Sequence, residues 1–337
     1  MLDRLREICM TDGTSGDEAA VREYIRSRIT ADEMTVDPLG NLIVFKKGRQ
    51  TPKNKVMLAA HMDEVGFMVT DITEDGFLRF GAVGGIDPRV VMGRAVRFKN
   101  GTPGIVGTKA VHQQTAEERK KAPEFDEMLI DIGAASAADA EKLVKRGDTA
   151  CFDTDYFTFG DGFVKGKAID DRAGCLIMMD MINSDLPYDM WFAFTVQEEV
   201  GTRGAKAAAF TVQPDIALVL ETTTACDISG SSGSKRVCEL GRGCEVSYMD
   251  RSTIYDRELY SLAFDTAKRL DIPVQTKTLV AGGNDSGAIH VSCGGVRTCA
   301  MSVPCRYLHS PSCVIKQSDL DATKALAAAM AEACAML

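Results

Sequence analysis

The sequence has little of what nucleic-acid-binding and membrane proteins require. Its 337 residues contain 39 Lys and Arg against 48 Asp and Glu, which gives a net charge of -9. No stripe of basic residues stands out, and phosphate binding depends on clustered Lys and Arg, so we expect no nucleic-acid partner. No apolar run is long enough to span a bilayer, and the N-terminal stretch lacks the apolar core of a signal peptide. We therefore expect a soluble protein with no membrane partner.

Paired cysteines and aromatic residues are also scarce. The 11 cysteines are odd in number, lie dispersed from Cys9 to Cys334, and include no CxxC pair. This usage fits reduced thiols better than a disulfide framework, so we predict a cytoplasmic location. A single Trp and an aromatic content of 7% provide few rings for a sugar-binding groove, which argues against a glycoside hydrolase.

What is present is a regular alternation of strand-like and helix-like segments. With 45% hydrophobic residues, the chain can bury at least one full core. An intermediate region changes texture, with many short strand candidates separated by glycine turns such as Asn100-Gly101. We predict an α/β fold, a mostly parallel sheet flanked by helices, formed by residues 1–65 and 166–337. Residues 66–165 would form an inserted, small β-rich domain.

Local signals predict where several helices begin. Ser15 and Glu18 have the spacing of a capping box, which predicts a helix that continues to Ile29. Ser318 is expected to cap a final helix that begins at Asp319. Further helices are predicted at residues 136–145, 171–183 and 257–270.

Six ionisable residues stand where predicted strands end or where a helix begins. They are His61, Asp170, Glu198, Glu199, Glu221 and His309. In an open α/β sheet, ligands bind beyond the carboxyl ends of the strands, so residues far apart in sequence can converge there. His with Asp or Glu is the set that binds Zn²⁺, Co²⁺ or Mn²⁺ without redox chemistry. The pattern predicts a two-metal hydrolase.

Positions within this set suggest a division of labour. Asp170, at the start of a helix, is the candidate to bridge two metals. Glu198 and Glu199 are adjacent and would point to opposite sides of an extended backbone, so one can bind metal while the other faces a water. Asp63 could accept the imidazole N–H of His61 and orient its ring. Each feature alone also has a purely structural interpretation, such as a charged helix N-terminus, and only their joint occurrence favours a metal site.

Seven motifs spread over nearly the whole chain resemble one family. They are AAHMDEVGF at 59–67, GGIDPRVVMGRAVRF at 84–98, EERKKAPEFDEMLIDIGA at 117–134, GKAIDDRAG at 166–174, QEEVGTRGA at 197–205, AGGNDSGAIH at 281–290 and RYLHSP at 306–311. In order and spacing they resemble the TET or glutamyl aminopeptidase family of di-metal aminopeptidases. Members of that family often carry an older cellulase-M or endoglucanase label.

The resemblance implies a ligand set for two divalent metal ions in each subunit. Asp170 would bridge both ions, which are expected to be Zn or Co, with Mn as a third candidate. His61 and Glu221 would complete one metal site, and Glu199 and His309 would complete the other.

The resemblance also implies the reaction, which is removal of N-terminal residues from peptides. Glu198 would be the general base on a metal-bridging water, and a metal would bind the free α-amino group of the substrate. Asp63 would support His61, and the peptide bond between Asp170 and Asp171 is expected to be cis. The preferred N-terminal residue stays open.

A homo-oligomer is a further implication of the resemblance. Dimers would form through the inserted domain, which would also control substrate access, and are commonly joined into a hollow dodecamer. Four positions in three segments depart from the family pattern and leave the native metal open: Glu221 replaces the usual Asp, Asn284-Asp285-Ser286 replaces Thr-Asp-Ala, and Cys305 replaces Thr. His112 lies where the family often has a His near the mouth of the active site.

Three other functions stay open at this point. A carboxypeptidase or deacylase on a related di-metal scaffold would need an arginine for the substrate carboxylate, and Arg89, Arg251 and Arg306 are candidates. A glycoside hydrolase would need two carboxyls on either side of a sugar. A non-catalytic binding protein would keep the site and lack the reaction.

Overall fold

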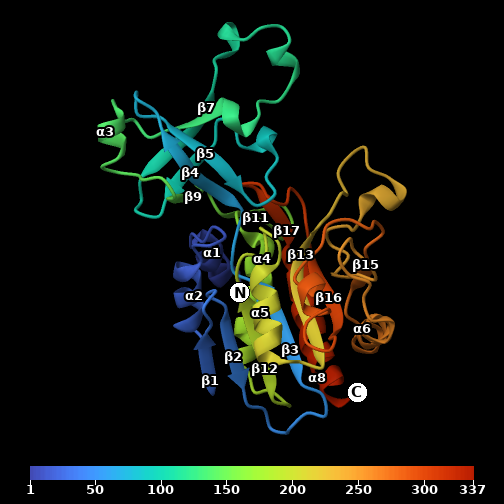
Figure 1. The fold of residues 1–337 in the computed structure, drawn as a ribbon. Helices are drawn as coiled ribbons and strands as arrows, with labels where there is room; N and C mark the ends of the chain where they lie inside the picture. Colours follow the sequence, from blue (N-terminus) through green and yellow to red (C-terminus); the bar gives the residue numbers. More distant parts are fainter.

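The computed structural model describes all 337 residues apart from the side chain of Ser234, and it contains a large sheet between helices and a separate barrel (Figure 1). In order across the sheet, its eight strands are β1 (Glu33–Val36), β2 (Leu42–Lys46), β12 (Met190–Thr195), β3 (Val56–His61), β13 (Ile216–Thr224), β16 (Arg297–Cys305), β14 (Cys244–Val246) and β15 (Val274–Thr276). The central strands β12, β3, β13 and β16 run parallel to one another. The predicted mostly parallel sheet is confirmed.

Helices cover both faces of this sheet. One face packs against α1 (Leu2–Met10), α2 (Ala19–Arg26), α4 (Ile169–Ile182), α6 (Arg257–Leu270) and α8 (Gln317–Met336). The other face packs against α5 (Arg203–Val212) and the short α7 (Ser286–Ile289). Because both faces are covered, strands such as β3 are buried along their whole length, which explains their continuous apolar runs. None of the described helices is both long enough and apolar enough to cross a bilayer.

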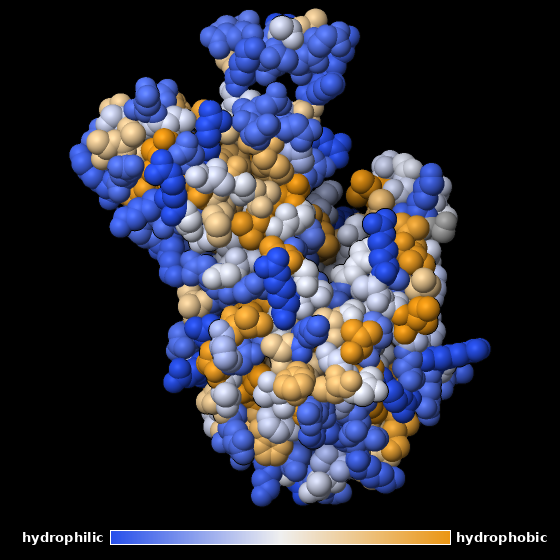
Figure 2. All heavy atoms as spheres, in the orientation of Figure 1, coloured by the Kyte–Doolittle hydropathy of each residue, from blue (hydrophilic) through white to orange (hydrophobic). Residues whose placement is uncertain are grey.

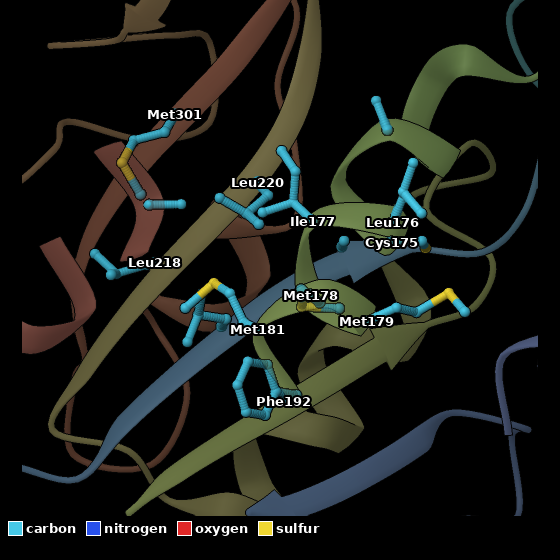
Figure 3. Packing of buried hydrophobic residues seen from close by; sticks show 14 of the residues in the cluster. Cys175, Leu176, Ile177, Met178, Met179, Met181, Phe192, Leu218, Leu220 and Met301 are labelled. Carbon is cyan, nitrogen blue, oxygen red and sulfur yellow. The ribbon is translucent and has the colours of Figure 1, made fainter. Parts of the chain in front are cut away.

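Helix α4 lies in the middle of the core. Thirteen of its fourteen residues are buried, so it has no polar face. Figure 3 shows Ile177 and Met181 of α4 near Phe192 of β12 and Leu218 and Leu220 of β13. This close packing holds the N-terminal end of α4, which carries Asp170, in a fixed position relative to the strands.

The inserted region forms a closed antiparallel barrel with its own core. Its strands follow the order β4 (Gly66–Ile72), β5 (Leu78–Val83), β8 (Met128–Asp131), β7 (Pro103–Thr108), β6 (Ala95–Phe98) and β9 (Thr149–Phe152). The predicted β-rich insertion and the hairpin at Asn100-Gly101, which joins β6 to β7, are confirmed. The exact domain boundaries stay a prediction.

Two further segments extend from these layers. Between β7 and β8, a stretch with the 3₁₀ helices η2 (Val111–Gln113), η3 (Glu118–Lys120) and η4 (Phe125–Glu127) projects from the barrel and carries a largely hydrophilic surface (Figures 1 and 2). A small sheet joins β10 (Phe157–Phe159), β11 (Phe163–Gly166) and β17 (Cys313–Lys316). The remaining helices are η1 (Pro88–Val90), α3 (Ala137–Ala140) and η5 (Gly233–Arg236).

The predicted capping box at Ser15 was wrong. The Ser15 hydroxyl instead donates a hydrogen bond to Asp63, and the Glu18 carboxylate accepts hydrogen bonds from the backbone N–H groups of Gly16 and Gln197. Helix α2 therefore begins only at Ala19, and it ends at Arg26. Long-range partners outcompete the local cap, and the local spacing contains no sign of them.

Two other helix boundaries also differ from prediction. The last helix begins at Gln317, before the expected cap Ser318, and the carboxylate of Asp319 accepts hydrogen bonds from the backbone N–H groups of Gly241 and Gly243. The helix predicted at 136–145 is reduced to the four residues of α3, capped by Ser136.

Candidate metal centre

Five neighbouring elements bring the predicted ligands to one edge of the sheet. His61 ends β3, opposite Thr195 on β12, and Glu198 and Glu199 follow β12. Glu221 lies inside β13, which continues to Thr224, so its predicted place at a strand end was wrong by three residues. His309 lies in the loop between β16 and β17, and Asp170 lies at the start of α4. The other four candidate metal ligands meet around Asp170.

Asp170 divides these ligands into two groups through its two carboxylate oxygens. The first oxygen, Oδ1, lies 3.3 Å from Nε2 of His61, and the same nitrogen lies 3.7 Å from Oε2 of Glu221. The second oxygen, Oδ2, lies 3.3 Å from Nε2 of His309, which lies 3.2 Å from Oε2 of Glu199. Ligands of a tetrahedral Zn²⁺ at bond lengths near 2.1 Å stand about 3.4 Å apart, so this spacing fits two metal ions on either side of Asp170.

The histidine rings present the correct nitrogen to these positions. Nδ1 of His61 lies 3.0 Å from the carbonyl oxygen of Asp63, and Nδ1 of His309 lies 2.8 Å from the carbonyl oxygen of Gly85. A carbonyl oxygen can only accept a hydrogen bond, so Nδ1 carries the proton in each ring. Each Nε2 is then free to donate its lone pair to a metal.

Burial and the closeness of several carboxylates make their negative charges unfavourable unless a cation binds among them. Burial, with the neighbouring charge of Asp170, raises the pKa of Glu199 to about 8. Burial likewise raises the pKa of Glu198 and of Glu221 well above the ordinary range for a glutamate. Burial opposes a charge on His309, yet the hydrogen bond and charge of Asp170, with Glu199, raise its pKa to about 10. A metal ion would satisfy these carboxylates better than protons do.

Unpartnered buried oxygens provide an independent test of this fit. Oε1 of Glu221 and Oδ2 of Asp171 are buried and have no hydrogen-bond partner among the described residues. Asp171, Asp170 and Glu221 also place ligand atoms within 4.8 Å of one another. A buried carboxylate oxygen without a donor is costly unless a cation binds it. The residues present therefore fit two divalent cations.

Asp63 joins the ligands to the candidate base. Its Oδ1 accepts a hydrogen bond from the backbone N–H of Glu198 at 3.0 Å, and its Oδ2 accepts one from that of Glu199 at 3.1 Å. The Ser15 hydroxyl also donates to Oδ2, at 2.5 Å. Toward His61, the carbonyl oxygen of Asp63 lies closer to Nδ1 than its carboxylate does, at 3.0 against 3.5 Å.

The backbone around the glutamate pair is not extended, which corrects the premise of the sequence argument. Gln197 has a φ of 57°, so the chain turns as it leaves β12. Glu198 and Glu199 follow this turn, and both line the same cavity. Asp63, which binds both N–H groups, fixes their direction in place of the strand.

Several residues near the centre were not assigned a role from sequence. The peptide bond between Asp170 and Asp171 is cis, as the resemblance implied. The backbone N–H of Gly174 donates to Asp171, and a Cβ at Gly174 would lie 2.5 Å from Oδ2 of Asp171, so only glycine leaves room there. Buried Asp285 lies 2.5 Å from the hydroxyl of Thr195. The closeness of Asp171 and Asp285 to the centre, and the need for glycine at position 174, become visible only in the three-dimensional structure.

A second cluster of carboxylates lies where the chain enters and leaves the insertion. Lys167 Nζ lies 2.9 Å from Oε1 of Glu64 and 2.7 Å from Oδ1 of Asp12, and Glu64 and Lys167 are almost completely buried. Asp12, Glu64 and Cys151 have metal-ligand spacing, but the ammonium of Lys167 already provides the positive charge.

The centre opens into a cavity of about 530 Å³ between the barrel and the main sheet. Its lining includes Gly85 and Asp87 of the insertion, the candidate centre, residues of strands β13 and β16, and Ser247, which follows β14. Figure 2 shows the surface hollowed between the barrel and the segment that projects on the right of that view. His112 is exposed on η2, in the segment that projects from the barrel, and does not line this cavity.

Sequence comparisons identify relatives over almost the whole chain. A family model described as M42 glutamyl aminopeptidase matches residues 40–326. A protein of Acetivibrio thermocellus is 43% identical over 325 residues, which are 95% of each chain. The lysyl aminopeptidase of Pyrococcus furiosus is 31% identical and covers 97% of this chain and 96% of its own. The glutamyl aminopeptidase of Lactococcus lactis is 29% identical, with coverage of 95% and 92%.

Solved structures agree with these relatives. An aminopeptidase of the archaeon Desulfurococcus kamchatkensis superposes with a TM-score of 0.92 at 31% identity, covering 98% of this chain and 94% of its own. The TET1 peptidase of Pyrococcus horikoshii, described as able to assemble into a tetrahedron or a large octahedral shell, has a TM-score of 0.86 at 33% identity and 98% coverage of both chains. A Thermotoga maritima protein named endoglucanase has a TM-score of 0.81 at 37% identity, with coverage of 98% and 97%.

Proposed function

The chain belongs to the M42 glutamyl aminopeptidase family and is a metallo-aminopeptidase, and from this premise we propose which residues carry the reaction. Asp170 would hold both of two divalent metal ions. His61 and Glu221 would hold one of them as well, and Glu199 and His309 would hold the other. The observation that carries this assignment is that each oxygen of Asp170 lies 3.3 Å from Nε2 of a different histidine, and that each of these nitrogens lies near a different glutamate, at 3.7 and 3.2 Å.

Glu198 is the residue that moves the proton. Two bound metal ions supply Lewis acidity toward the peptide carbonyl and its attacking water. Glu198 takes a proton from that water and returns it to the leaving amine, so the same carboxyl acts first as a base and then as an acid. Its raised pKa, caused by burial, suits this exchange, and its backbone N–H is held by Asp63.

The substrate is a peptide with a free N-terminal amine. Carboxylates dominate the centre, and such a group of negative charges favours a positively charged or metal-binding amine close to the scissile bond. A carboxypeptidase would need an arginine there, but Arg89 and Arg306 pair with Asp87 and Asp227, and neither they nor Arg251 line the cavity. No aromatic side chain lines the cavity either, in the part of the chain that the structure describes, which disfavours a glycoside hydrolase.

A Glu198→Gln variant tests the proposal. We expect turnover to fall roughly 100- to 10,000-fold, because a glutamine cannot accept the proton, while metal content stays at that of the wild type. Glu141→Gln, an exposed glutamate on the barrel, is the matched control. Near-normal turnover by the Glu198 variant would remove it from this role.

Which end of the peptide the enzyme requires distinguishes an aminopeptidase from a carboxypeptidase or deacylase. A peptide with a free amine should be cleaved, and the same peptide with an acetylated amine should not. Preferential cleavage from the carboxyl terminus would favour the carboxypeptidase or deacylase alternative.

Assembly, location and metal identity are also proposals. We propose a homo-oligomer in which dimers form through the barrel, supported by the assemblies described for the Pyrococcus horikoshii relative. Light scattering tests this, and a monomer at working concentration would contradict it. The eleven free cysteines support a cytoplasmic location. Metal analysis of the purified protein would distinguish Zn from Co and Mn.

A further inference from the structure

The cavity continues from the centre along the sheet toward its edge. On one row of the sheet, Glu221 of β13 lies opposite Ser302 of β16, which lies opposite Glu245 of β14. Lys277 follows β15, the edge strand that pairs with β14. Neighbouring strands stand about 4.8 Å apart, so this row extends away from the metal ligands by more than the length of one substrate side chain. Ser302 and Lys277 both line the cavity.

Beyond the centre, two lysines and two aspartates line the cavity, and both aspartates have partners outside it. Apart from the proposed metal ligands and Glu198, the charged lining residues are Asp87, Asp250, Lys235 and Lys277. Asp87 pairs with Arg89. Asp250 is 2% exposed, and its carboxylate already accepts hydrogen bonds from Ser252, Thr253 and Tyr255. Both acidic residues are thus occupied by partners of their own.

Lys277 keeps hydrogen-bonding capacity for a ligand. Its ammonium donates to the carbonyl oxygen of Ala281 at 3.0 Å and has no carboxylate within 4.0 Å among the described residues. Glu245 is fully buried close by, and burial raises its pKa to about 7, so its charge only partly offsets that of Lys277.

We propose that Lys277 binds the side-chain carboxylate of the substrate's first residue, so that the enzyme prefers peptides that begin with Glu or Asp. The inference rests on the proposed function, because it takes the first residue to be held at the metal centre. Family membership alone does not decide this preference, since the matched relatives include both a lysyl and a glutamyl aminopeptidase. Lys277 is a specificity residue and takes no part in the chemistry.

The test compares chromogenic Glu, Leu and Lys substrates across variants of Lys277. For Lys277→Met we expect kcat/KM on the Glu substrate to fall roughly 10- to 100-fold, the range of one hydrogen bond to a charged group, with the Leu substrate changed less than threefold. Lys277→Arg should restore much of the Glu activity, and Lys277→Glu should shift the preference to Lys. Lys206→Met, an exposed lysine on α5, is the matched control.

Three outcomes would overturn the inference. They are an equal loss on the Glu and Leu substrates, a wild-type enzyme that prefers Lys or Leu, and a Glu preference unchanged in Lys277→Met. Binding of free L-glutamate, measured by calorimetry, provides a readout that does not need turnover. An enzyme that cleaves no unblocked substrate would refute the proposed function, and L-glutamate binding that weakens in Lys277→Met would still support the carboxylate pocket.

Discussion

Replacement of Asp63 by asparagine should disturb the centre although no proposed metal ligand changes. The Asp63 carboxylate is fully buried and accepts three hydrogen bonds, from the Ser15 hydroxyl and from the backbone N–H groups of Glu198 and Glu199. Asparagine has the same shape but only one acceptor oxygen in place of two. Whichever way its amide turns, one of the two glutamate N–H groups must face an NH₂ group.

The cost follows from that unpaired donor. A buried N–H without an acceptor costs about 1 to 3 kcal/mol. At roughly 1.5 °C for each kcal/mol in a chain of this length, the thermal midpoint should fall by about 2 to 4 °C. Glu198 and Glu199 would lose their fixed direction, and we expect turnover or metal affinity to fall roughly 10- to 100-fold, as for other residues that orient metal ligands.

Differential scanning calorimetry and steady-state kinetics at saturating metal measure both effects. Asp75→Asn, at an exposed turn of the barrel, is the matched control. Wild-type turnover together with an unchanged midpoint in Asp63→Asn would refute the argument that Asp63 orients the two glutamates.

Three further predictions concern stability and metal. Burial raises the pKa of Glu245 to about 7 in the folded protein, above its ordinary value of 4.5, so the stability that its neutral form contributes is present below pH 4.5 and lost as pH rises through 7. The thermal unfolding midpoint of Glu245→Gln should therefore rise relative to that of the wild type as the pH increases from 5 to 8. A difference between the two midpoints that does not change with pH would contradict this. Gly174→Ala should lose roughly 1 to 3 kcal/mol in unfolding because its Cβ would contact Asp171, whereas Gly107→Ala, with open space around it, should lose little. Exhaustive chelation should abolish activity and lower the midpoint, with recovery on adding Zn²⁺, Co²⁺ or Mn²⁺; activity that survives chelation would exclude a metal enzyme.

Much of the fold could be predicted because hydrophobic periodicity is a local property. The helix expected at residues 257–270 has the same bounds in the structure, and the central strands and the barrel hairpin lie where their patterns placed them. The convergence of His61 and His309 was also predictable, because parallel strands bring their carboxyl ends to one edge of a sheet.

What could not be predicted depends on contacts across the chain. Ser15 and Glu18 have the spacing of a cap, yet their side chains bind Asp63 and the segment after β12. The turn at Gln197 likewise depends on tertiary contacts and not on strand propensity. The place of Lys277 in the cavity depends on the strand order of the sheet, which hydrophobic periodicity does not predict.

The ion pair between Glu64 and Lys167 determines how the barrel is attached. Glu64 lies in the connection from β3 to β4, and Lys167 lies in the connection from β11 to α4. Their side chains meet at 2.9 Å in a buried position, and each is within four residues of a proposed metal ligand. Because the two connections are joined at their base, the ends of the insertion are already brought together independently of its length, and lengthening it adds little further closure entropy. Evolution could thus enlarge, trim or reshape the barrel while the candidate metal centre keeps the same geometry.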